Sequence, residues 1–224
     1  MIDLVVAPPL TAKIRSGSDG PELLVVGSAA SLLEGDELRI TLVLGAGARL
    51  TVRTVAAQIA HPCLYGGSTA MHVTASVGVA GRLVWWPEPT IVCGGGRHVA
   101  TATVDLAAGA TAVWVDELVL GRSGEHPGDV DVTTSLVVDH DGLPLLRDGL
   151  AVGAPGSLGP AVLGGARYVG ARHELGRRAE PQDGPADAPR FDLAGPATSW
   201  RVLAADVAAG RTALGGDRSL LGQA

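Results

Sequence analysis

Two side chains that bind transition metals, His61 and Cys63, lie two residues apart in the first half of the chain. On an extended backbone this spacing places both on one face. Imidazole and thiolate suit ions such as nickel, so this pair is the best candidate for part of a metal site, completed by Cys93 or His98 from a neighbouring segment. The alternative is ordinary packing in a β-rich core, because metal sites usually show tighter motifs and a free cysteine behaves as a small apolar residue.

Catalytic motifs are missing from the sequence. It contains neither a Gly-x-Ser-x-Gly nucleophile motif nor a His-Glu-x-x-His zinc motif. Asp116 and Glu117 form the notable carboxylate pair, but adjacent residues on a strand point to opposite faces, which disfavours joint acid–base chemistry. An enzyme that uses Asp116, Glu117 and His126 is one alternative. The pattern favours a binding or scaffold protein without catalytic residues.

The elements that must position these residues are β-strands joined by small turns. Residues 38–44 and 49–54 alternate between apolar and polar side chains, with a Gly-Ala-Gly-Ala turn between them. The same unit recurs at 71–86 and at 101–116, so the turns fall roughly thirty residues apart. This repetition predicts a mostly β fold in which strand units stack as in a β-helix. A β-sandwich is the alternative, since its hairpins give a similar pattern.

The second half of the chain contains a hairpin signal, a polar loop and a helix signal. His140-Asp141-Gly142 predicts a tight turn between two strands. The Pro-rich stretch around 176–190 predicts an exposed, mobile loop. The spacing of Trp200, Leu203, Val207 and Leu214 predicts a helix near the C-terminus, capped by Thr198 or Ser199 and ended by Gly215 and Gly216. We expect one domain over residues 1–224, with one or two helices.

Composition narrows the classes of partner. The chain has 224 residues, 46 % of them hydrophobic, which is enough for a core of its own. The net charge is -6 and Lys13 is the only lysine, so nucleic acid is not an expected partner. Two cysteines are too few for a disulfide framework. The N-terminus lacks a signal-peptide pattern and the apolar runs are too short to span a membrane, so we expect a cytoplasmic protein without a membrane partner.

The Trp85-Trp86 pair suggests a contact surface. Neighbouring strand residues point to opposite faces, so one ring enters the core while the other needs a different cover. Tryptophan is enriched at the centres of protein interfaces. Trp86 is therefore an interface candidate, and burial of both rings between layers of the same chain is the alternative.

Four motifs follow one another in a characteristic order. Gly35-Asp36 precedes an alternating strand, LVWWPEPTIVCG covers 83–94 and leads to Arg97, LVLGRSGE covers 118–125, and PLLRD covers 144–148. Together they resemble the UreD family of urease accessory proteins. The resemblance runs from about residue 27 to residue 214. The sequence departs from the family where Ala29-Ala30 replaces a Gly-Gly pair and where the N-terminal region is short.

The resemblance implies a β-helix-like stack and a role in loading nickel into apo-urease. The implied partners are a helical UreF-like protein, a UreG-like GTPase bound through it, and apo-urease itself. No catalytic residue and no stably bound cofactor are implied, only nickel in transit through the interior. Trp86 and the polar residues of the matched motifs are then predicted to lie at an interface or along an ion path: Asp36, Glu88, Arg97, Asp116, Glu117, Arg122 and Asp148.

Overall fold

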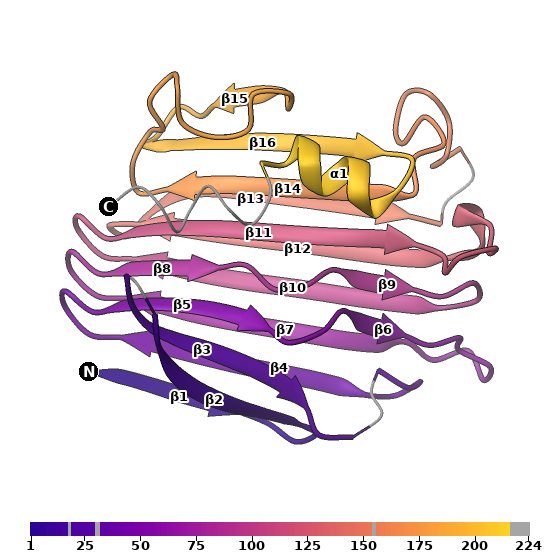
Figure 1. The fold of residues 1–224 in the computed structure, drawn as a ribbon, viewed down its shortest axis with the longest axis horizontal. Helices are drawn as coiled ribbons and strands as arrows, with labels where there is room; N and C mark the ends of the chain where they lie inside the picture. The colour runs from indigo at the N-terminus through magenta and orange to yellow at the C-terminus, as the bar shows by residue number, and fades with distance from the viewer. Residues whose placement is uncertain (18, 30–31, 154–155, 216–224) are drawn as a thin grey trace.

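Two β-sheets packed face to face make up most of the molecule, as the computed structural model shows for residues 1–17, 19–29, 32–153 and 156–215 (Figure 1). The six-stranded sheet has the order β1 (Ile2–Val6), β4 (Glu37–Leu44), β7 (Thr69–Val77), β10 (Arg97–Leu106), β12 (Asp131–His140), β13 (Leu143–Val152). The ten-stranded sheet has the order β15 (Arg190–Asp192), β16 (Ala197–Ala204), β14 (Tyr168–Leu175), β11 (Thr111–Leu120), β8 (Arg82–Trp85), β5 (Arg49–Thr54), β3 (Gly20–Gly27), β2 (Leu10–Gly17). Two short strands, β6 (Gln58–Ala60) and β9 (Thr90–Val92), complete the second sheet.

Three successive corner units form the middle of the stack. In each, the chain runs along the six-stranded sheet, turns, and continues in the ten-stranded sheet: β4 to β5, β7 to β8, and β10 to β11. Equivalent strands of successive units pair in parallel. The corners also bond to one another, since Gly78 N donates to Leu44 O and Ala107 N donates to Val77 O. This arrangement confirms the predicted β-helix-like stack.

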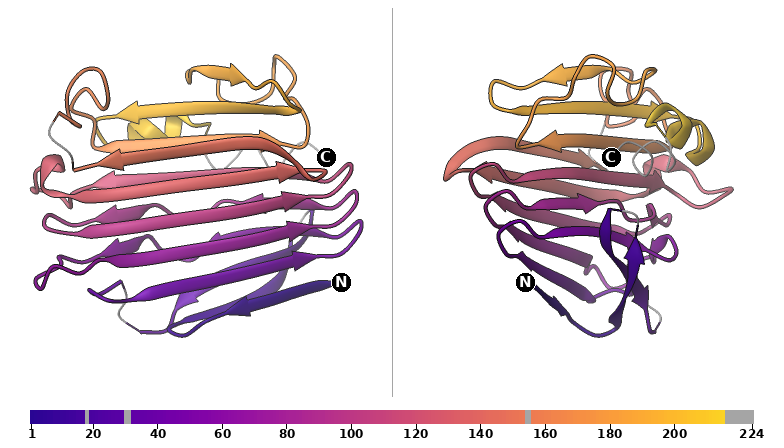
Figure 2. Two further views of the ribbon diagram at one scale, coloured as in Figure 1. Left: turned by 180° about the vertical axis from the view of Figure 1, so that it is seen from behind. Right: turned by 60° about the vertical axis from the view of Figure 1, so that its left-hand side comes forward.

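Antiparallel strands close the stack at both ends (Figure 2). At the N-terminal end β1 pairs with β4, and β2 pairs with β3. At the C-terminal end β12 and β13 form the hairpin predicted at 140–142, while β14 and β16 add to β11. Strand β14 has no counterpart in the sequence prediction, because all eight of its residues are buried, including Arg172, His173 and Glu174, so its sequence lacks the apolar–polar alternation.

Apolar side chains fill the space between the sheets and a second layer outside one of them. The alternation in β4 buries Leu38, Ile40, Leu42 and Leu44 to 2 % exposure or less. Trp85 and Trp114 stack in this core with ring centroids 5.0 Å apart. Trp86 points the opposite way, into a second cluster on the outer face of the ten-stranded sheet that includes Tyr168, Trp200 and Leu214. Both rings of the Trp85-Trp86 pair are therefore buried.

The predicted C-terminal helix exists, but its predicted start is wrong. Trp200 and Leu203 belong to β16, and helix α1 covers only Val207–Ala213. Asp206, rather than Thr198 or Ser199, caps it by accepting a hydrogen bond from Ala209 N. Pairing with β14 makes 197–204 a strand, so tertiary contacts override the helical spacing. Gly216 lies outside the described residues.

Residues 176–190 lie over the outer face of the ten-stranded sheet. Most of their side chains are exposed, but Ala179 and Ala188 are buried in the second apolar cluster. Arg190 donates to the carbonyl groups of Ala179 and Glu180 and lies over the ring of Trp200. Among the described residues, no helix is long and apolar enough to cross a membrane.

Candidate functional site: a cavity behind a break in the sheet

The ten-stranded sheet is interrupted near its middle. The strand that begins as β8 stops at Trp85 and resumes as β9 at Thr90, because Pro87 and Pro89 cannot donate to a ladder. The neighbouring strand is interrupted at 55–57, between β5 and β6. Strand β11 pairs with β8 up to Trp114 and with β9 from Leu118 onward. The break therefore lies beside residues 115–117 of β11.

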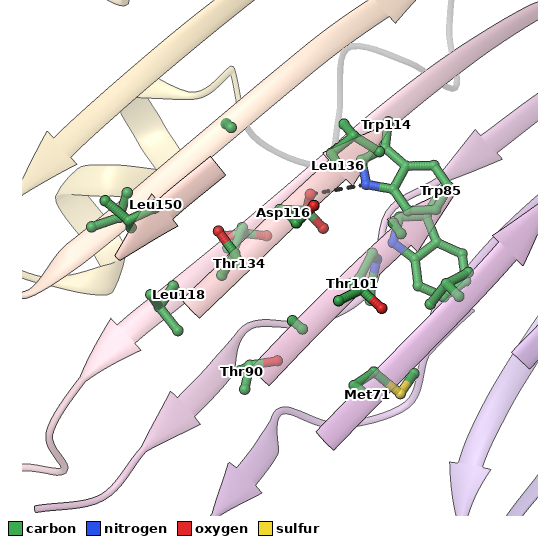
Figure 3. A pocket seen from close by; sticks show the side chains of 18 of the residues that line it. Met71, Trp85, Thr90, Thr101, Trp114, Asp116, Leu118, Thr134, Leu136 and Leu150 are labelled. Atoms are coloured by element: carbon green, nitrogen blue, oxygen red, sulfur yellow. Dashed lines mark hydrogen bonds between the residues drawn. The ribbon is translucent and has the colours of Figure 1, made fainter. Parts of the chain in front are cut away.

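A cavity of about 120 Å³ lies between the sheets behind this break (Figure 3). Small side chains of the six-stranded sheet, such as Ala100, Ala102 and Thr134, line one wall and leave space there. The stacked rings of Trp85 and Trp114 line the opposite wall. Thr54, Gln58 and Glu88, from the interrupted segments, line the cavity where it meets the break.

Asp116 projects into this cavity from β11. Its side chain remains accessible although it lies deep in the molecule, because the accessible surface faces the cavity. Trp114 Nε1 donates to Asp116 Oδ2 at 2.9 Å, as the dashed line in Figure 3 shows. Burial raises the pKa of Asp116 to about 6, and the nearby Asp148 carboxylate adds to the effect. At neutral pH the carboxylate is therefore mostly ionised and carries a negative charge.

Asp148 lines the same cavity from β13, but it is already paired. Arg201 Nη2 binds both of its carboxylate oxygens, at 2.5 and 2.6 Å. His173 Nε2 lies 3.6 Å from Asp148 Oδ2, and burial lowers the pKa of His173 to about 4, so this ring is neutral at pH 7. The Asp148–Arg201 pair carries no net charge, which leaves Asp116 as the main source of negative potential near this pair.

Glu88 and Glu117 meet on the outer side of the break. Arg211 of α1 donates from Nε to Glu117 Oε2 at 2.8 Å, from Nη2 to Glu117 Oε1 at 3.0 Å, and from Nη2 to Glu88 Oε2 at 2.9 Å. Tyr168 donates its hydroxyl to Glu117 Oε2 at 2.8 Å. The hydrogen bond to Glu117 raises the pKa of Arg211, so the guanidinium remains charged.

Of the residues predicted from the motifs, the structure gathers Glu88, Asp116, Glu117 and Asp148 around the cavity. Trp86 lies nearby on the outer face of the sheet, but it is only 5 % exposed and is covered by residues of its own chain.

The other predicted residues lie in the stacked loops at the end of the molecule away from the corners. Asp36 accepts from Leu33 N, and Arg97 donates to Gly66 O. Arg122 pairs with Glu125, which also accepts from Gly94 N. The pKa of Glu125 is lowered to about 2 by these bonds, that from Arg122 first. These contacts hold turns in place and do not reach the cavity.

His61 and Cys63 also lie at this loop end. Cys63 Sγ is 3.8 Å from the Arg97 carbonyl oxygen, while Cys93 is buried and His98 faces the core. His98 Nδ1 pairs with Thr69 Oγ1 at 2.8 Å, and burial lowers the pKa of His98 to about 4. Within the part of the chain that the structure describes, no three His, Cys, Asp or Glu side chains converge as a metal site would require.

Two arginines that pair with carboxylates of the cavity lining were not singled out as site residues from the sequence. Arg201 and Arg211 both come from the last elements of the chain, where the only signal was a helical spacing that proved misleading. The structure does not bring together the three residues of the enzyme alternative, because His126 caps the short 3-10 helix at Pro127–Asp129 and does not line the cavity with Asp116 and Glu117.

Comparison with known proteins points to one family. The family model described as UreD urease accessory protein matches residues 4–219. A urease accessory protein UreD from Parafrankia sp. (strain EAN1pec) is 41 % identical over 180 residues, which cover 70 % of this chain and 60 % of the relative. A urease accessory protein UreD 1 from Streptomyces griseus is 38 % identical over 187 residues, covering 83 % and 71 %. The chain thus spans about 60 to 70 % of the length of these relatives.

Proposed function

The chain belongs to the UreD family of urease accessory proteins, and we propose that it serves urease maturation as a non-catalytic scaffold whose interior lets nickel pass toward apo-urease. One observation carries the proposal. Asp116 faces an accessible cavity directly behind a break in the sheet, and among the described residues it is the cavity carboxylate that forms no ion pair with an arginine.

The chemistry of the cavity suits an ion that enters and leaves. Carboxylate oxygen attracts a hydrated divalent cation, and His98, the imidazole among the described lining residues, already pairs through Nδ1 with Thr69 Oγ1. Transit requires binding that is strong enough to admit the ion and weak enough to release it. Asp116 supplies one negative charge, while Arg201 neutralises Asp148. Nickel is thus the cargo of this site and not a resident cofactor.

The proposal includes the partners that the family resemblance implies. They are a helical UreF-like protein, a UreG-like GTPase bound through it, and apo-urease, all in the cytoplasm. A scaffold of this kind needs contact surfaces and no turnover of its own.

Asp116→Asn tests the route. The substitution keeps the shape and the hydrogen bond from Trp114 but removes the charge that attracts the ion. In cells that express urease with its accessory proteins under limiting nickel, we expect the variant to lower urease activity several-fold. Added nickel should restore part of the activity.

Asp105→Asn is the matched control, because Asp105 is exposed on the outer face of the six-stranded sheet. We expect it to leave urease activity unchanged. Equal activity with Asp116→Asn and wild type under limiting nickel would show that the ion does not depend on this carboxylate. The scaffold role would then need another basis.

A further inference from the structure

We propose that helix α1 is a charge gate for the cavity, in which Arg211 offsets one of the two carboxylate charges at the break and thereby restricts the entry of cations. This inference rests on the proposed function for its purpose, since it assigns regulation to the same cavity. Its evidence, however, is the local geometry of α1 and the break.

Arg211 contacts two residues that line the cavity, and it does so from outside the sheet. Its Nη2 atom lies 2.9 Å from Glu88 Oε2 and 3.0 Å from Glu117 Oε1, so both carboxylates converge on one nitrogen. The side chain of Glu117 is fully buried and that of Glu88 is 37 % exposed. The guanidinium therefore occupies the position where a cation entering through the break would meet these two carboxylates.

The helix that carries Arg211 is small, and its apolar contacts come from Val207, Ala213 and the following Leu214, which pack in the second apolar cluster. It has seven residues, and its one buried residue is Gly210. A side chain at position 210 would meet the ring of Tyr168, since an added Cβ would lie 2.1 Å from Tyr168 Cδ1. Leu214, the next buried residue, follows the helix. The ion pairs of Arg211 add to these apolar contacts in holding α1 against the sheet.

Docking of α1 changes the charge at the break. With α1 in place, two carboxylates and one guanidinium leave one net negative charge there. Without the guanidinium the same place carries two negative charges. Short segments at the surface, such as this seven-residue helix, are among those that open locally at the lowest cost. Displacement of α1 thus makes the break more attractive to divalent cations.

Fluorescence quenching measures this gate on the isolated protein. Trp85 and Trp114 line the cavity, whereas Trp86 and Trp200 lie in the outer cluster. In a Trp86→Phe, Trp200→Phe background, the emission reports only the cavity pair. Cs⁺, I⁻ and acrylamide then probe access by a cation, an anion and a neutral molecule. Circular dichroism and thermal melting check that each variant is folded.

In this background we expect Arg211→Gln to raise the ratio of Cs⁺ to acrylamide quenching roughly twofold, the effect of one unit charge at about 8 Å in water. The ratio of I⁻ to acrylamide quenching should fall. Added salt should reduce both changes, since it screens exposed charges. Arg39→Gln is the control, because it removes the same charge from the outer face of the six-stranded sheet, where Arg39 pairs with Glu37; it should change neither ratio.

Two further variants separate charge from structure. Arg211→Lys keeps the charge and should keep the wild-type ratios, and Arg211→Gln combined with Glu88→Gln restores the net charge and should return the ratios toward wild type. Equal increases with all three quenchers, or no change with any, would overturn the gate. This test is independent of the proposed nickel route. If Arg211→Gln changes the quenching ratios while Asp116→Asn supports full urease activity, the gate is retained and the nickel route is rejected.

Discussion

Asp116 and Asp148 line one cavity, yet their surroundings give them different chemistry. Arg201 binds both oxygens of Asp148, so that carboxylate is neutralised in place. Asp116 receives a hydrogen bond from Trp114 and remains accessible to the cavity, and burial raises its pKa to about 6. The carboxylate without an ion pair is therefore the one that changes its charge between about pH 5 and pH 7.

The raised pKa of Asp116 predicts a pH-dependent stability. In the folded protein the carboxyl binds its proton more tightly than in the unfolded chain, where its pKa is 3.8. Its contribution to the free energy of unfolding therefore falls as the pH rises from about 4 to about 6, and is constant on either side. We expect the free energy of unfolding of Asp116→Asn to rise relative to that of wild type between about pH 4 and about pH 6. Above pH 6 the variant should be the more stable protein. Urea denaturation at intervals from pH 4 to pH 8 measures it.

Other carboxylates require a control in that experiment. Glu125 has a lowered pKa and acts in the opposite direction, since its contribution is lost as the pH falls below its ordinary value of 4.5. Because Glu125 is present in both proteins, the difference between wild type and Asp116→Asn cancels its effect. A difference that is flat from pH 4 to pH 8 would contradict the raised pKa of Asp116.

At the scale of elements, the three corner turns repeat one backbone conformation with different residues. Gly47, Ala80 and Gly109 occupy equivalent positions, with φ angles of 66°, 54° and 67°. In each corner the next residue donates its N–H to the carbonyl three residues earlier. The left-handed conformation costs an alanine about 1–2 kcal/mol, and glycine adopts it freely. The middle corner is therefore the strained one.

Ala80→Gly is accordingly expected to raise the free energy of unfolding by about 0.5–1 kcal/mol, after the greater entropy of glycine in the unfolded chain is subtracted. Gly109→Ala, at the equivalent corner, should lower it by about 1 kcal/mol. Chemical denaturation of both variants provides the comparison. If Ala80→Gly is destabilising, the corners do not share the same energetics.

At the scale of the whole molecule, a stacked fold is closed at both ends and opened in the middle. Antiparallel strands cover both ends of the stack, so the parallel units do not continue into a fibre. The prolines at 87 and 89 interrupt the ten-stranded sheet where the cavity lies. The accessible interior thus lies midway along the stack, where a partner on the outer face could reach it.

A scaffold role predicts stable association. We expect the tagged chain, expressed with a UreF-like protein, to elute from size exclusion as a complex that then captures apo-urease. Asp116→Asn should form the same complex, because its side chain lies inside the protein. A well-behaved monomer that binds neither protein would favour the alternative of a β-solenoid binding module without a role in urease maturation.

The class of fold and the family could be predicted from the amino-acid sequence, because both depend on local, repeated signals. Period-two alternation in β4 and β10 and small residues at the corners specify strands and turns through neighbouring residues alone. The motifs around Trp85-Trp86-Pro87 and Gly121-Arg122 led to the UreD family, which the family model confirms.

Tertiary structure alone decided which polar residues meet. Arg201 is 53 residues from Asp148 and Arg211 is 94 residues from Glu117, distances over which no local pattern records a contact. Asp116 and Arg122 are close in the sequence, yet Asp116 faces the cavity beside the break in the neighbouring strand, whereas Arg122 lies in a turn. Strand pairing likewise made 197–204 a strand despite its helical spacing, because ladder bonds to β14 outweigh a weak intrinsic preference.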